Sequence, residues 1–105
     1  MAEAQLCRRL STTDWRCDPV VSPVAPGRLF FYTRVKAVQN TTIEHRWYHE
    51  DRLRQSVELR IRASPASGYR TYTRQTVTAE NAGNWRVELR TKDGSLLCEE
   101  RFVVR

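Results

Sequence analysis

The feature that most constrains this chain is a two-residue alternation of apolar and polar side chains, repeated along most of its length. Between residues 57 and 62, Val57, Leu59 and Ile61 alternate with charged residues. Such strict alternation is typical of a β-strand with one buried face and one face in water. No segment shows a sustained helical period. The pattern therefore predicts an all-β protein.

The alternating segments are separated by short stretches of turn-forming residues. Asp93-Gly94 is the strongest hairpin signal, because this dipeptide readily adopts the left-handed backbone of a tight turn. Strands of about six to nine residues joined by short turns predict a two-layer sandwich or a small barrel. The predicted strands cover residues 29–36, 42–49, 57–62, 69–77, 85–90 and 95–105.

Two tryptophans, Trp47 and Trp85, lie in the middle of predicted strands, each on the apolar face. We expect both to pack between the two sheets. A chain of 105 residues has room for one modest core. Replacing either tryptophan by alanine is therefore predicted to remove about 3–5 kcal/mol of stability.

The first quarter of the chain lacks a clear strand or helix period. Three of the four prolines, Pro19, Pro23 and Pro26, cluster there. Prolines close together favour extended chain over regular structure. We therefore expect residues 1–27 to form an extended N-terminal arm or linker, and residues 28–105 to form the β-sandwich domain.

The chain has three cysteines, two of which lie in this N-terminal segment. Cys7 and Cys17 either form a disulfide, which would add about 3 kcal/mol of stability, or remain two reduced thiols. We take the disulfide as the hypothesis to test. Cys98 alternates with apolar neighbours in a strand pattern and is expected to be a small buried side chain. No cysteine pair has the spacing of a structural zinc site.

The chain is basic, with 18 lysines and arginines against 12 acidic residues and a formal charge of +6. A positive surface favours anionic partners such as nucleic acid, phospholipid or acidic glycan. The cations are scattered along the chain, however, and many sit beside acidic residues. This distribution favours a solvated arginine-rich surface over a dedicated anion site.

Candidate catalytic and metal-binding residues are few. His45 and His49 are the only histidines, and on a strand their four-residue spacing puts them roughly 13 Å apart, too far to share one metal ion. His45 is expected to be a core or edge histidine satisfied by hydrogen bonds. Glu99 and Glu100 are adjacent, so on a strand they point to opposite faces. The sequence thus predicts a protein that is not an enzyme and needs no cofactor or metal.

Two tyrosines and two arginines form the predicted ligand-binding site. Tyr32 and Tyr48 fall on faces assigned to solvent, with Arg34 and Arg46 close by in sequence. Exposed rings beside guanidinium groups can stack sugars, bases or apolar side chains of a partner. We therefore expect one exposed patch around these four residues. The alternative is that these rings pack under loops or on a covered sheet face.

Five segments together carry a resemblance to a known family: Leu29–Val35, Glu44–His49, Gly68–Thr73, Gly83–Val87 and Asp93–Phe102. In order and spacing, residues 27–105 resemble the bacterial family known as domain of unknown function 2914. The resemblance implies an immunoglobulin-like antiparallel β-sandwich, here of about six to seven strands, within a longer bacterial protein that is often exported or membrane-associated. It brings no assigned catalytic residues.

Three classes of function remain open. The first, which we favour, is an accessory module that binds a protein or a cell-envelope polymer without turnover. The second is a binder of single-stranded nucleic acid or another polyanion. The third is a structural domain that forms a homodimer through an edge strand. We expect an extracytoplasmic or membrane-associated location, with the cytoplasm as the alternative. No apolar run has the ~20 residues of a transmembrane helix.

Overall fold

Eight β-strands and one turn of 3-10 helix make up the fold, which a computed structural model describes for residues 1–105. None of the helical structure has the length and apolar character that crossing a bilayer requires. In chain order the elements are β1 (Ala2–Ser11), β2 (Arg16–Pro19), β3 (Gly27–Val35), β4 (Thr41–His49), β5 (Arg52–Ile61), β6 (Tyr69–Val77), η1 (Ala79–Asn81), β7 (Gly83–Thr91) and β8 (Leu96–Val104).

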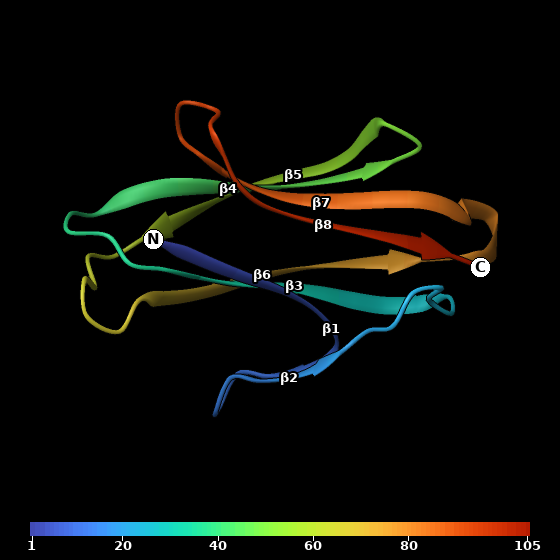
Figure 1. The fold of residues 1–105 in the computed structure, drawn as a ribbon, viewed down its shortest axis with the longest axis horizontal. Coiled ribbons are helices and arrows are strands. Elements are labelled where there is room, and N and C mark those ends of the chain that lie inside the picture. Colours follow the sequence, from blue (N-terminus) through green and yellow to red (C-terminus); the bar gives the residue numbers. More distant parts are fainter.

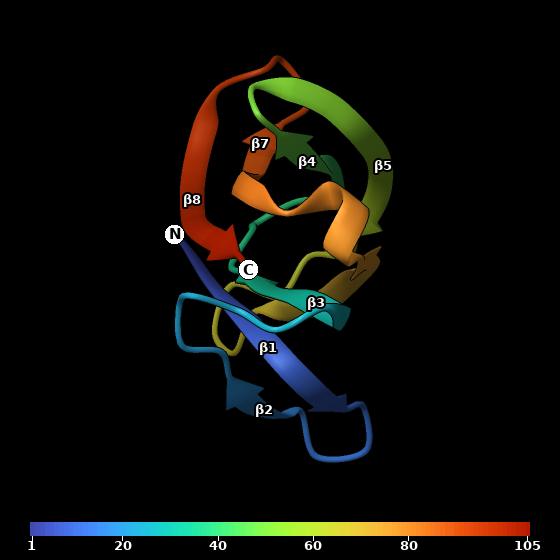
Figure 2. The same ribbon diagram turned by 90° about the vertical axis from the view of Figure 1, so that its right-hand side faces the viewer.

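The strands form two four-stranded antiparallel sheets that pack face to face (Figures 1 and 2). Sheet A has the order β2-β1-β3-β6, and sheet B has the order β5-β4-β7-β8. The predicted all-β antiparallel sandwich is confirmed. If the short β2 is set aside, the chain crosses between sheets after β3, β5 and β6, as in immunoglobulin-like folds with the fourth strand beside the third. The two termini lie at opposite ends of the long axis (Figure 1).

The core lies between the sheets and consists of the inward-facing residues of the alternating segments. Fourteen apolar residues are buried there, from seven of the strands and from Val24 in the β2–β3 connection. Trp47 is fully buried and Trp85 is 3% exposed, so the predicted placement of both tryptophans is confirmed. The indole N–H of Trp85 donates to the carbonyl of Asn81, 2.7 Å away, so this polar group is satisfied at the edge of the core.

A short polar network crosses this core. Both ring nitrogens of His45 lie within hydrogen-bond distance of threonine hydroxyls, Thr33 at 2.9 Å and Thr73 at 2.8 Å. The indole N–H of Trp47 donates to the same Thr73 oxygen at 3.0 Å. Burial removes the ring from water, which disfavours its charged form and lowers the pKa of His45 from 6.5 to about 3. His45 is thus the hydrogen-bonded core histidine that the sequence predicts.

The prediction of an extended arm over residues 1–27 is wrong. Residues 2–11 form β1, which lies inside sheet A between β2 and β3, with Ala2 opposite Val35 and Leu6 opposite Phe31. Ala2 and Ala4 pack against the core, and Leu6 is buried in it. The sandwich therefore begins at residue 2 and has eight strands instead of six or seven.

The proline-rich connection between β2 and β3 also has a structural role. The Val24 N–H donates to the Val103 carbonyl at 2.7 Å, and the Arg105 N–H donates to the Val24 carbonyl at 3.0 Å. Val24 is 2% exposed. This connection covers the end of edge strand β8 and satisfies backbone groups that would otherwise remain open to pairing with another chain.

Candidate functional site

Three cross-strand pairs on the outer face of sheet A combine aromatic rings with arginines. Side chains directly opposite each other on neighbouring antiparallel strands have Cβ atoms about 4.5–5.5 Å apart, so these pairs form one continuous surface. Tyr72 is 38% exposed in the middle of it. The three pairs, between β3 and β6, are Phe30–Arg74, Tyr32–Tyr72 and Arg34–Arg70.

A fourth ring reaches this surface from the β1–β2 hairpin. The indole of Trp15, in the hairpin turn, stacks on Tyr32 with centroids 5.5 Å apart and planes 20° apart. It also meets Tyr72 edge-on at 6.3 Å, and Phe30 lies 6.1 Å from Tyr72. Trp15 has φ 56°, a left-handed conformation that is rare for a bulky residue. We call Trp15, Phe30, Tyr32 and Tyr72 the aromatic face.

The hairpin that carries Trp15 is closed by the Cys7–Cys17 disulfide, with the two Cα atoms 5.4 Å apart. Cys7 is fully buried and lies opposite Phe30 of β3. The bridge therefore ties β2 to the strand that borders the aromatic face. By closing the hairpin near its base, it restricts where the turn and its indole can lie.

The arginines of this face are mostly without acidic partners. Arg34 forms an ion pair with Glu3, with Nη2 and Oε2 2.5 Å apart. Arg28, Arg70 and Arg74 are exposed and take part in no ion pair. Arg70 Nε instead donates to the Tyr32 hydroxyl at 3.2 Å. The aromatic face is thus bordered by guanidinium groups that remain free to meet an anion.

The four residues of the predicted site do not form one patch. Tyr32 and Arg34 lie on the outer face of sheet A, whereas Arg46 and Tyr48 lie on the outer face of sheet B, on the opposite side of the molecule. The chain crosses from one sheet to the other between β3 and β4. Alternation within a strand separates its inner from its outer face, but it does not say which sheet the strand joins.

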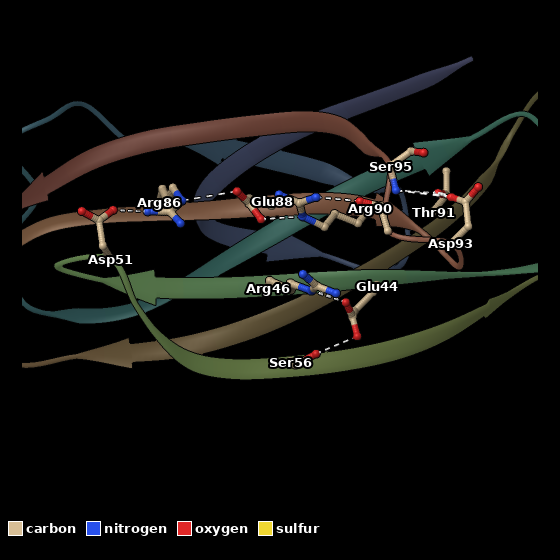
Figure 3. Close-up of polar contacts among 11 residues, drawn as sticks. Glu44, Arg46, Asp51, Ser56, Arg86, Glu88, Arg90, Thr91, Asp93 and Ser95 are labelled. Atoms are coloured by element: carbon tan, nitrogen blue, oxygen red, sulfur yellow. Dashed lines mark hydrogen bonds and ion pairs between the residues drawn. The ribbon is translucent and has the colours of Figure 1, made fainter.

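On the two central strands of sheet B, Arg46, Arg86 and Arg90 are held by acidic neighbours (Figure 3). Arg46 is paired with Glu44, whose second carboxylate oxygen accepts from Ser56 at 2.8 Å. The guanidinium of Arg86 lies 3.9 Å from the ring centroid of Tyr48, a cation–π contact. These contacts occupy Arg46 and Tyr48, so the sheet B half of the predicted site offers little to a ligand.

Glu88 is the centre of the sheet B network. Its side chain is almost fully buried, and its two oxygens accept from Arg90 Nε at 2.8 Å and Arg86 Nε at 3.3 Å. Burial raises the pKa of Glu88, but the bonds from Arg90 and Arg86 outweigh it and hold the pKa below its usual value. Arg86 also contacts Asp51. Along β7, acidic and basic groups therefore neutralise one another (Figure 3).

The remaining candidate residues lie apart. His45 is inside the core, whereas His49 stacks on Trp85 with ring centroids 4.8 Å apart. Glu99 lies opposite Glu88 on the outer face, and its neighbour Glu100 lies opposite the buried Val87 on the inner face. Burial raises the pKa of Glu100. The structure therefore brings neither pair together.

A pocket of about 430 Å³ lies at the end of sheet B, where the β4–β5 turn approaches β8. Glu50, Asp51, Arg86 and Arg101 are among its lining residues, together with Trp85. Arg86 is already bound by Asp51 and Glu88. The charges that line this pocket are balanced, and the pocket lies away from the aromatic face.

Sequence reasoning missed most of the aromatic face. The alternation of β3 could have placed Phe30 beside Tyr32, and that of β6 could have placed Arg70, Tyr72 and Arg74 on one face. Their pairing depends on the β3–β6 register, which joins segments about 40 residues apart. No sequence pattern could have placed Trp15 on this surface, because its position depends on the hairpin and the disulfide.

Two antiparallel sheets, with an aromatic and basic surface on the outside of one of them, define a small β-sandwich module. The family described as Protein of unknown function (DUF2914) matches residues 40–104, and the chain belongs to this family. The match begins just before β4, so it includes the β6 half of the aromatic face and leaves out the half on β1–β3. A comparison with curated proteins finds no match.

Proposed function

We propose that this domain is a non-enzymatic binding module, which attaches a larger bacterial protein to another protein or to a cell-envelope polymer. The outer face of sheet A is the binding surface. The observation that carries the proposal is the contact between the aromatic face and arginines that have no acidic partner.

The physical support is the contrast between the outer face of sheet A and the two central strands of sheet B, β4 and β7. On sheet B, Glu88 and its neighbours neutralise Arg86 and Arg90. On sheet A, four rings gather at the surface, and Arg70 and Arg74 flank them unpaired. Aromatic side chains supply large rigid contact areas at low entropic cost, and arginine adds directed hydrogen bonds; both are enriched at binding surfaces.

The disulfide supports an extracytoplasmic location within this proposal. Disulfides persist in oxidising compartments and are rare in the cytoplasm. Because the Cys7–Cys17 bridge borders the aromatic face, the surface is best ordered where the bridge is stable.

The proposal can be tested by nuclear magnetic resonance. We expect peptidoglycan fragments or envelope polysaccharide, added to isotope-labelled oxidised protein, to shift the indole resonance of Trp15 and the amides of β3 and β6. The amides of β4 and β7 should stay unchanged. Shifts confined to sheet B, or to the pocket beside Trp85, would contradict the proposed surface.

Light scattering on the same sample tests the structural alternative. A module of the proposed kind needs no self-association, and we expect a monomer. A stable dimer whose formation protects the amides of an edge strand would favour a structural domain instead.

A further inference from the structure

We infer that the ligand of the aromatic face is an acidic polysaccharide, a chain of pyranose rings bearing carboxylate groups. This inference rests on the proposed function and narrows the ligand class. It follows from the charge of the surface, the arrangement of its rings and the disulfide beside it.

The positive charge of the outer face of sheet A favours an anionic ligand. Arg34 and Arg70 lie directly opposite each other on β3 and β6, and only Arg34 has an acidic partner, Glu3. Like charges directly opposite on neighbouring strands are destabilising, so an anion between them would relieve the repulsion. Arg28 and Arg74 add two further unpaired guanidinium groups on the same face. The surface therefore complements several negative charges in a row.

The rings of the aromatic face favour a ligand that contains sugar rings. A pyranose ring presents a face of C–H groups that packs on an aromatic ring, while its hydroxyl and carboxylate groups project from the rim. Tyr72 is exposed at the centre of the face, and Trp15 covers Tyr32 beside it. A guanidinium binds a carboxylate with two parallel hydrogen bonds. Arg70 and Arg74, opposite Arg34 and Phe30, are placed to do so at the rim of a stacked sugar.

Two features of the surface favour a polysaccharide over single-stranded nucleic acid as the ligand. Trp15 and Tyr32 already stack on each other with centroids 5.5 Å apart, which leaves no slot between them for a base. The disulfide favours an oxidising compartment, where acidic glycans are common polyanions. Both observations favour a sugar polymer that lies across the surface.

The test is calorimetric titration of the oxidised protein with four polymers: polygalacturonate, its methyl-esterified form, polyglutamate and oligothymidylate. Polygalacturonate should bind most tightly. Esterification, which removes the charge and keeps the rings, should weaken binding about tenfold or more. Polyglutamate, which keeps the charge and lacks the rings, should also bind more weakly by about tenfold.

Three variants locate the site. Arg74→Gln and Tyr72→Thr should each weaken polygalacturonate binding about tenfold, since they remove a guanidinium and a ring from exposed strand positions. Arg60→Gln is the matched control, because Arg60 is an exposed arginine without an ion pair, on β5 of sheet B. It should change the affinity by less than about twofold.

The outcomes separate the two proposals. Equal binding of polyglutamate and polygalacturonate, or of the esterified and acidic polymers, overturns the polysaccharide inference and leaves the surface itself standing. Binding of oligothymidylate that is tighter than that of polygalacturonate and depends on Tyr72 has the same consequence: it overturns the polysaccharide inference and leaves the surface standing. Failure of polygalacturonate to bind also overturns it. If Arg60→Gln weakens binding as much as Arg74→Gln does, the proposed surface is wrong as well.

Discussion

The indole of Trp15 lies nearly parallel to the ring of Tyr32, although one residue is in a hairpin turn and the other is in the middle of β3. This contact keeps the indole against sheet A on a backbone with φ 56°. A strained conformation at a surface ring indicates that the surroundings fix the ring's position.

We predict that Trp15→Asn removes the ring with little loss of stability. Asparagine tolerates the left-handed backbone better than tryptophan does, and the relief of about 1 kcal/mol offsets the loss of a stacked pair worth about 0.5–1.5 kcal/mol. Trp15→Ala loses the same stack without that relief and should melt at a lower temperature. Thermal unfolding of the two variants side by side checks the order, and a more stable alanine variant would contradict it.

Reduction of the Cys7–Cys17 disulfide should lower the free energy of unfolding by about 3 kcal/mol, because the bridge closes a short loop that otherwise adds entropy to the unfolded chain. The packing of Trp15 on Tyr32 should loosen as well, which tryptophan fluorescence reports. Calorimetry with and without a dithiol reductant measures the loss. Cys98→Ser, which keeps the bridge, should respond to reductant like the parent protein; if it no longer responds, the bridge is not the cause.

The buried His45 predicts a specific loss of stability in mild acid. Its pKa is near 3 when folded and 6.5 when unfolded, so below pH 6.5 the unfolded chain binds a proton that the folded protein does not. The contribution of the neutral His45 to the free energy of unfolding is complete above pH 6.5. It is lost as the pH drops toward 3, by about 2 kcal/mol between pH 6.5 and pH 4.5.

Urea denaturation across this range measures the slope, and two variants assign it. His45→Gln should flatten the pH dependence, because an amide can keep hydrogen bonds to Thr33 or Thr73 without titrating. His49→Gln should leave the slope in place. A slope that survives in His45→Gln would show that another group is responsible.

Glu88→Gln should destabilise the protein by roughly 1.5–3 kcal/mol, since it weakens two charge-assisted bonds and leaves Arg86 and Arg90 partly unpaired. Glu99→Gln, directly across on β8, changes a carboxylate whose partner Arg101 is exposed, and should cost less than about 1 kcal/mol. Chemical denaturation at neutral pH compares them. Equal losses of stability in the two variants would mean that the burial of Glu88 does not strengthen its ion pairs.

Strands β3, β4, β5, β7 and β8 could be predicted because their inner positions include large apolar side chains, and β6 because it is rich in tyrosine and threonine, which are good strand formers. Leu59 and Ile61 on β5, or Val87 and Leu89 on β7, stand out against charged neighbours. β1 follows the same alternation, but its first two inward residues are alanines, which are poor strand formers and bury little area. A bulge between Cys7 and Arg9 then breaks the pattern, so the sequence predicts an arm where the structure has a strand.

The site could be predicted only in part, for a different reason. Tyr32 and Arg34 could be assigned to an outer face because the alternation of β3 is strong. Their neighbours Tyr72 and Trp15 come from distant parts of the chain, and contacts of that kind are set by strand order and by the disulfide. Local patterning carries no information on either.

The placement of the two termini at opposite ends of the long axis has a mechanical consequence (Figure 1). Tension between the ends would run along β1 and β8, parallel to the strands and across their hydrogen bonds. The rows joining β1 to β3 and β7 to β8 would then have to slide and break together, because a pull in this direction cannot peel them open one at a time. A domain built this way resists stretching more strongly than one whose strands can be peeled apart in turn.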